Sequence, residues 1–123
     1  MNAVLIGACA AFLAVAMGAF GAHLFSDVLI GPHRDWYELA ANYQFLHALG
    51  LMFLGLHQRT VGKTVWHRRS ALSFVIGVCV FSGCLYAMAL GAPRALGAVV
   101  PLGGAALLLG WVFTALAVRH EAV

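Results

Sequence analysis

The chain has 123 residues, of which 63% are hydrophobic and 9% are charged, and its formal net charge is +3. This length suits one domain, but a typical soluble domain carries about 25% charged residues, so the composition excludes a water-soluble globular protein. The seven Lys and Arg are scattered and form no continuous basic stripe, which excludes nucleic acid as a partner. Several apolar stretches are instead long enough to cross a hydrocarbon layer of about 30 Å as helices.

Four apolar segments are predicted to cross the membrane in chain order: residues 2–25, 36–57, 70–90 and 96–118. Gly31 and Pro32 lie in the polar stretch between the first two segments, where they break the helix. The rings of Trp36 and Tyr37 suit the membrane interface at the start of the second segment. The sequence therefore predicts an all-α fold, an integral-membrane four-helix bundle with antiparallel up-down topology. Residues 1–123 form its single transmembrane domain.

A basic connector separates the second and third segments and decides the expected orientation. Its four cations are Arg59, Lys63, Arg68 and Arg69. The other two loops offer only Arg34 and Arg94. Because short loops rich in Lys and Arg stay in the cytoplasm, four crossings place both termini inside, the N-in/C-in arrangement. We expect His57 and His67, which flank the connector, to be solvated at the membrane surface. Exposure of the Arg68 region outside intact cells would contradict this orientation.

Small residues recur at a three-and-four spacing along the first and fourth segments. They are Gly7, Ala11, Ala14, Gly18 and Ala22 in the first, and Gly103, Ala106 and Gly110 in the fourth. Helix association in lipid gains nothing from the hydrophobic effect, so such faces hold helices together by close packing. Cys9, Cys79 and Cys84 lie inside apolar runs without a C-x-x-C spacing. We interpret them as small buried apolar residues.

Polar side chains inside the apolar segments are the candidate functional residues, because a polar group in hydrocarbon needs a partner or a water-filled cavity. Tyr43, Gln44 and His47 fall within an arc of about 100° on the second helix, with His47 close to the membrane midplane. Ser82 and Tyr86 are four residues apart and share one face of the third helix. Antiparallel packing brings these groups to similar depths. We therefore predict one polar cluster in the outer half of the bundle: His23, Tyr43, Gln44, His47, Ser82 and Tyr86.

Two interpretations of this cluster stay open. In the first, which we favour, the side chains join helices through hydrogen bonds of about 0.6 to 2 kcal/mol each. In the second, they line a pocket open to the outer side that binds a small molecule, a lipid headgroup or an ion. We expect no cofactor and no metal site, because His23 and His47 lack the i, i+4 spacing of ligands on one helix. No nucleophile is paired with a recognisable base, so the sequence predicts no enzyme.

Four strings of the sequence together resemble a known family. They are GAFGAH at 18–23, YQFLHAL at 43–49, FSGCLY at 81–86, and PLGG at 101–104 leading to Gly110 and Trp111. This combination resembles the YgdD-like family of small uncharacterised inner-membrane proteins of bacteria, a family of unknown function. The resemblance implies a multi-pass protein of the bacterial inner (plasma) membrane and implies no activity. Ser is usual in that family where Cys84 stands, which argues against a thiol-dependent role.

The expected function is that of a non-enzymatic accessory or structural membrane subunit. Four short helices enclose little volume, so we expect a homo-oligomer or membership of a larger membrane complex, surrounded by membrane lipids. The alternative is a binding or transport protein for a small solute or lipid, which would use a polar pocket in the outer half of the bundle.

Overall fold

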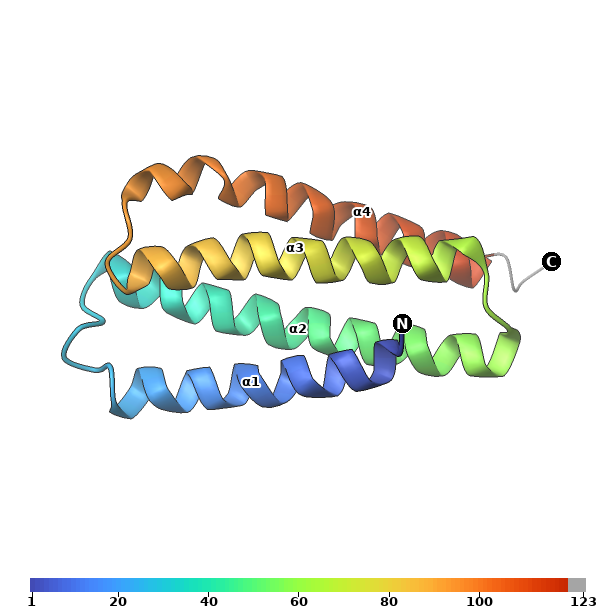
Figure 1. Ribbon diagram of the computed structural model, residues 1–123, viewed down its shortest axis with the longest axis horizontal. Coiled ribbons are helices and arrows are strands. Elements are labelled where there is room, and N and C mark those ends of the chain that lie inside the picture. The colour runs from blue at the N-terminus through green and yellow to red at the C-terminus, as the bar shows by residue number, and fades with distance from the viewer. Residues whose placement is uncertain (120–123) are drawn as a thin grey trace.

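The structure is a computed structural model that describes residues 1–119. Within this range it contains four α-helices and one short 3-10 helix. In chain order they are α1 (Ala3–His23), α2 (Pro32–Val61), α3 (Val65–Ala89), η1 (Arg94–Ala98) and α4 (Val100–Arg119). Consecutive helices run antiparallel (Figure 1). Four helical segments are long and apolar enough to cross a membrane, which confirms the all-α fold with four candidate spans. The N-in/C-in orientation stays a prediction.

The second helix is longer than the predicted segment and absorbs part of both flanking loops. It begins at Pro32 rather than at residue 36, because a proline in the first turn lacks only an amide N–H that would have no helical partner there. Gly31 and Gly62 border it, with φ angles of 59° and 89°. Only residues 62–64 then separate α2 from α3, so Arg59 lies in α2, and Arg68 and Arg69 lie in α3. Most of the predicted connector is therefore helical.

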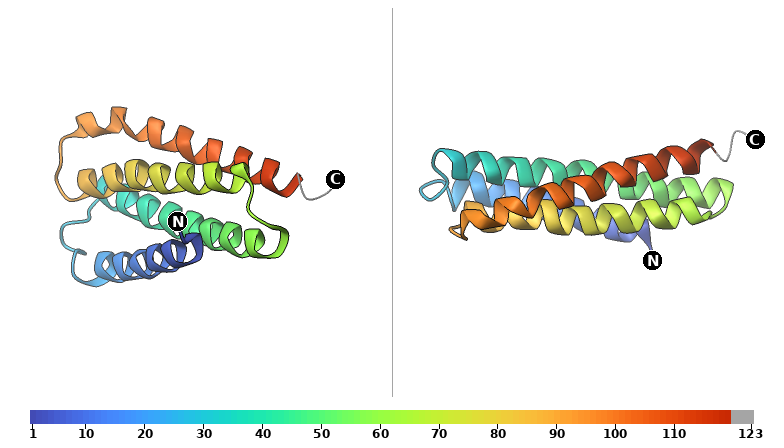
Figure 2. Two further views of the ribbon diagram at one scale, coloured as in Figure 1. Left: turned by 45° about the vertical axis from the view of Figure 1, so that its right-hand side comes forward. Right: turned by 90° about the horizontal axis from the view of Figure 1, so that it is seen from above.

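The helices form an open series rather than a closed ring. α1 packs against α2, α2 against α3, and α3 against α4. Figure 1 and the left view of Figure 2 place α1 and α4 at opposite edges of the molecule. A much smaller share of α1 and α4 is buried than of α2 and α3. Each edge helix thus has one helix as its main neighbour.

Glycines bring these neighbouring helices into direct contact. A Cβ atom at Gly7 would lie 2.6 Å from the backbone oxygen of Ala48 in α2. At Gly103 it would lie 2.5 Å from the backbone nitrogen of Phe81 in α3. The predicted small-residue face of α4 is therefore confirmed at the buried residues Gly103 and Gly110. The predicted small-residue face of α1 is confirmed only in part. Gly18 is exposed, and a Cβ atom there would meet no other atom within 4 Å.

The cysteines correct a second expectation. Cys9 and Cys79 are exposed on the outer faces of their helices, and Cys84 is only half-buried. The interpretation of Cys9 and Cys79 as buried residues was wrong, because the rotation of α1 and α3 turns these positions away from the neighbouring helices. A thiol is apolar enough to face lipid without a partner.

Replacing Gly103 with Ala should destabilise the α3–α4 contact by about 1 to 3 kcal/mol, because the added methyl group meets backbone atoms that have no room to move. Gly83 is the matched control, since a Cβ there meets nothing within 4 Å. Thermal unfolding followed by circular dichroism in one detergent measures both variants. Equal stability of Gly103→Ala and Gly83→Ala would contradict the close α3–α4 packing.

Candidate functional site

Gln44 is the centre of a hydrogen-bonded group that joins three helices. Its Nε2 atom donates to the backbone oxygen of Ala10 in α1 at 2.9 Å. Its Oε1 atom accepts a hydrogen bond of 2.7 Å from the hydroxyl of Tyr86 in α3. Both ends of the buried amide are thus used within the chain, and a single side chain of α2 ties α1 to α3.

Two further side chains of this group bond to the backbone of a neighbouring helix. The Ser82 hydroxyl donates to the backbone oxygen of Ala40 at 2.8 Å. The Tyr37 hydroxyl donates to the backbone oxygen of Met17, and the Tyr37 ring meets that of Tyr86 edge-on. Tyr37 was expected at the membrane interface, but it is only 2% exposed. Because α2 already begins at Pro32, Tyr37 lies in its second turn, where it faces α1 and α3.

His47 forms a second polar group, between α2 and α4. Its Nδ1 atom lies 2.7 Å from the backbone oxygen of Tyr43, and its Nε2 atom accepts the indole N–H of Trp111 at 3.0 Å. An indole nitrogen only donates, so Nε2 carries no proton and Nδ1 carries the proton that it donates to Tyr43. In this geometry the imidazole is therefore neutral. The ring of Phe74 packs edge-on against both His47 and Trp111.

The predicted cluster of six residues is thus divided. Gln44, Ser82 and Tyr86 lie in the first group, and His47 lies in the second. The Tyr43 ring stacks on Phe81, and its hydroxyl has no hydrogen-bond partner among residues 1–119.

His23 does not join either group. It is exposed at the end of α1, where its backbone oxygen accepts a hydrogen bond from Ser26. Its place near the outer end of the first helix was predicted, but the rotation of α1 turns its side chain away from α2.

Sequence reasoning missed Tyr37 and Trp111 as members of the polar groups. Tyr37 is seven residues before Gln44, a spacing that places both on one face of α2 and could have indicated the shared group. Trp111 lies within an apolar segment, far from the interfacial position usual for tryptophan, so its N–H needed an acceptor. Among the described residues, no buried side-chain nitrogen or oxygen lacks a hydrogen-bond partner.

A third polar group lies where α2 meets α3. His67 is 1% exposed, and its Nε2 atom lies 2.9 Å from Nδ1 of His57. The backbone N–H of Thr64 donates to Nδ1 of His67 at 3.1 Å, as part of the cap of α3. The expectation that His67 is solvated was therefore wrong, because the short connector folds its ring between the two helix ends.

Hydrogen bonds also join the first turns of α3 to the second half of α4. The hydroxyl of Ser70 lies 2.7 Å from that of Thr114 and donates to the backbone oxygen of Gly110 at 2.8 Å. Thr114 bonds to the same carbonyl oxygen at 2.9 Å. No group of three or more His, Cys, Asp or Glu within residues 1–119 is placed to hold a metal ion.

Three hollows lie beside these groups. The α2–α4 hollow has a volume of about 530 Å³, and its lining includes Tyr43, His47, Phe81, Gly104 and Trp111. A second hollow of about 380 Å³ lies at the α1–α2 loop end, with Arg34, Glu38 and Asn42 in its wall. A third, the connector pocket, measures about 210 Å³ and lies at the opposite end. Gln44, Ser82 and Tyr86 line none of these three hollows.

Comparison with known proteins places this chain among small membrane proteins. The family described as "Protein of unknown function (DUF423)" matches residues 17–104. A UPF0382 membrane protein of Staphylococcus epidermidis is 40% identical over 114 residues, which cover 93% of this chain and 92% of the relative. The UPF0382 inner membrane protein YgdD of Escherichia coli K12 is 34% identical over 109 residues, 88% of this chain and 82% of the relative. No solved structure matches the chain significantly.

The chain belongs to this family of unknown function. Membership confirms the resemblance seen in the four sequence strings and the expectation of a multi-pass membrane protein, since four helices are also apolar enough to span. The expected inner-membrane location agrees with the name of the Escherichia coli relative. Membership in the DUF423 family brings no activity with it, so the chemistry rests on the geometry of the polar groups.

Tyr86→Phe should destabilise the helical assembly by about 1 kcal/mol, because it removes one hydrogen bond and leaves the buried Oε1 atom of Gln44 without a donor. Tyr43→Phe also removes a phenolic oxygen, but the Tyr43 hydroxyl has no hydrogen-bond partner among residues 1–119. The stability should therefore change by less than about 0.5 kcal/mol. Unfolding of both variants in one detergent gives the comparison. Indistinguishable stabilities would show that the Tyr86–Gln44 bond does not hold α2 and α3 together.

Proposed function

We propose that this protein is a non-enzymatic accessory or structural subunit of the inner membrane. It acts through contacts of its helix faces with further copies of itself or with a larger membrane complex. The observation that carries this proposal is the open series of helices, in which α1 and α4 each have one helix as their main neighbour. In lipid, close packing of small residues rather than the hydrophobic effect joins such an edge to another protein surface.

The hydrogen bonds that the polar groups already make within the protein support a role without catalysis. A general acid or base must reach the proton that it moves, within about 3 Å. In this chain both nitrogens of His47 and both ends of the Gln44 amide already bond to other parts of the protein. Glu38 lies in the early turns of α2 and is exposed, far along the helix from His47. These groups hold helices together, and neither ring nitrogen of His47 is left without a partner to act as an acid or a base.

The small-residue face of α1 also leaves room for a contact with another protein. Gly18 and Ala22 are exposed and line the hollow beside α2 at the loop end, so this half of the face remains available for close packing. Cys9 is exposed on the opposite side of α1, about 180° around the helix axis from Gly18, and reports a partner on the side that faces away from this hollow.

Thiol crosslinking in native membranes should give a species heavier than the 13.0 kDa monomer from protein whose only cysteine is Cys9. The matched control keeps only Cys79, which is equally exposed but lies on the interior helix α3, and should crosslink less. Native mass spectrometry then distinguishes a second copy from a different protein. An isolated monomer in both measurements would remove the support for an accessory or structural subunit.

A second candidate function is the binding or transport of a small solute or lipid, and the α2–α4 hollow is the observation in its favour. Its wall is mainly apolar. Tyr43, His47 and Trp111 are the members that carry polar side-chain atoms, and the last two bond to each other. An occupant would therefore be an apolar molecule or lipid chain rather than the polar solute that the sequence suggested. Of the predicted pocket residues, Tyr43 and His47 line this hollow, whereas Gln44, Ser82 and Tyr86 do not.

Native mass spectrometry of the protein in native-lipid nanodiscs separates the two functions. Binding in the hollow predicts a retained small molecule that is lost in Gly104→Leu, which fills the hollow, and kept in Gly83→Leu, whose side chain faces open space. The subunit proposal predicts no retained molecule that depends on Gly104. Loss of a specific ligand in Gly104→Leu alone would therefore favour the second function.

A further inference from the structure

The acidic residues of the described chain all lie at one end of the helices. Asp27, Asp35 and Glu38 are in the α1–α2 loop and the first turns of α2, and Arg34 and Arg94 share that end. Five cations lie at the opposite end: Arg59, Lys63, Arg68, Arg69 and Arg119. Along α2, Glu38 and Arg59 are about 30 Å apart at 1.5 Å per residue, several times the screening length of about 8 Å. No described acid therefore neutralises the cationic end.

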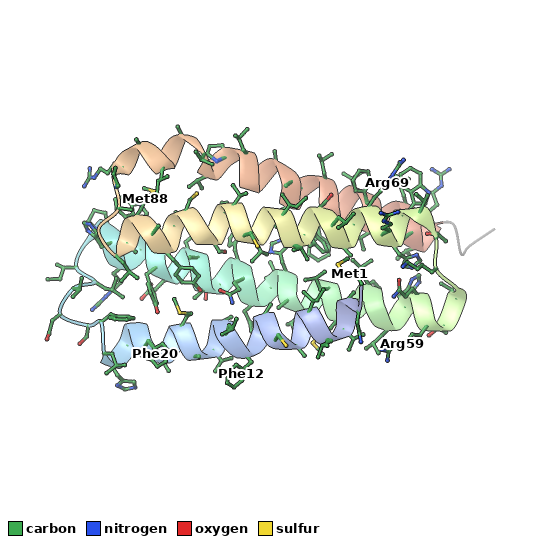
Figure 3. The ribbon with its side chains drawn as sticks, viewed as in Figure 1. Met1, Phe12, Phe20, Arg59, Arg69 and Met88 are labelled. Carbon is green, nitrogen blue, oxygen red and sulfur yellow. The ribbon has the colours of Figure 1, made fainter. Side chains whose placement is uncertain are left out.

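Two of these cations line the connector pocket. Its polar wall consists of Gln58 from α2, Lys63 from the connector, and His67 and Arg68 from α3. Its apolar wall comes from α2, from α3 and from the start of α1, and consists of Met1, Ala3, Leu54, Ala71 and Leu72. Figure 3 shows Met1 at the start of α1, on the side toward α3. The hollow thus has a cationic part and an apolar part, and it lies at the ends of the spanning helices.

The local fold adds to the positive potential of this pocket. α3 begins at Val65, and the first amides of a helix carry a partial positive charge that favours anions. The buried ring of His67 is held by the backbone N–H of Thr64, which places the start of α3 at the pocket wall. Two exposed cations and the first turn of α3 therefore lie at the wall of the same small volume.

We propose that the connector pocket binds the phosphate group of an anionic phospholipid. Lys63 and Arg68 neutralise the phosphate through charge-assisted hydrogen bonds, and Gln58 donates from α2. Leu54, Ala71 and Leu72 contact the glycerol and the upper part of an acyl chain. Inorganic phosphate carries the same kind of negative charge as the phospholipid headgroup, but it has no apolar part to contact the apolar wall of the pocket. This site is independent of the proposed subunit role, because it lies within one chain.

A matched pair of variants distinguishes a built site from a charged surface. Lys63→Gln together with Arg68→Gln removes two charges from the pocket. Arg59→Gln together with Arg69→Gln removes two charges from the same end, where Figure 3 labels both side chains. Neither arginine lines the pocket. Arg69 instead lies over the ring of Trp66, 5.1 Å from its centroid. Lys63 and Arg68 are exposed, so both double variants should fold as the wild type does.

The experiment uses the full chain in nanodiscs of phosphatidylcholine with a minor fraction of phosphatidylglycerol, followed by native mass spectrometry. The wild type should retain one phosphatidylglycerol in preference to phosphatidylcholine. Lys63→Gln/Arg68→Gln should lose this retention by about tenfold or more, and Arg59→Gln/Arg69→Gln should stay within about twofold of the wild type. The exchange Lys63→Arg/Arg68→Lys keeps both charges and should keep the lipid, which controls for folding.

Three results would overturn the proposal. Equal losses in the two double variants would show a diffuse attraction to the charged end, and equal retention of both lipids by the wild type would show no anionic site. A preceding wash with millimolar inorganic phosphate provides the third arm. Displacement of the lipid by that wash would assign the pocket to free phosphate, whereas persistence of the lipid supports the phospholipid.

Discussion

The structure depends on the need of each buried polar atom in hydrocarbon to find a hydrogen-bond partner. An unsatisfied group costs several kcal/mol where no water is available, so such a side chain binds to whatever helix lies beside it. Gln44 meets this constraint by bonding to Ala10 on one side and Tyr86 on the other. One amide therefore sets the order in which α1, α2 and α3 lie side by side.

Packing and polar bonding reinforce each other on the α4 side. Gly103 and Gly110 let α4 approach α3 closely, and a Cβ at Gly110 would lie 2.4 Å from the Phe74 ring. The same ring packs against His47 and Trp111, which hydrogen-bond to each other across α2 and α4. The glycine contacts thus bring Trp111 within reach of His47. Polar side chains used in this way stabilise the assembly and explain why an intramembrane histidine does not by itself indicate a reaction.

The two ends of the molecule differ in charge, and this difference has separate structural and functional consequences. By the rule that short loops rich in Lys and Arg stay in the cytoplasm, cations at the connector end predict the orientation of the whole chain, whatever their exact positions. Lys63 and Arg68 do more than this, because the short turn between α2 and α3 gathers them around one hollow with a buried imidazole behind it. Arg69 shares their charge but stacks on Trp66. Lys63, Arg68 and Arg69 carry the same charge, and only their positions in the structure distinguish the two that line the pocket from the one that does not.

The sequence by itself determined the four apolar helices, their up-down order and the polar residues that must turn inward, such as Gln44 and Tyr86. These features follow from local hydropathy and helical spacing, which neighbouring helices do not alter. Only the tertiary structure decided that Gln44 pairs with Tyr86 and that His47 pairs with Trp111. It also decided that His23 joins neither of these two polar groups. Pairing depends on how far each helix is rotated about its axis and on which helix lies next to it. Contacts between residues distant in sequence set both, so no local pattern could state them.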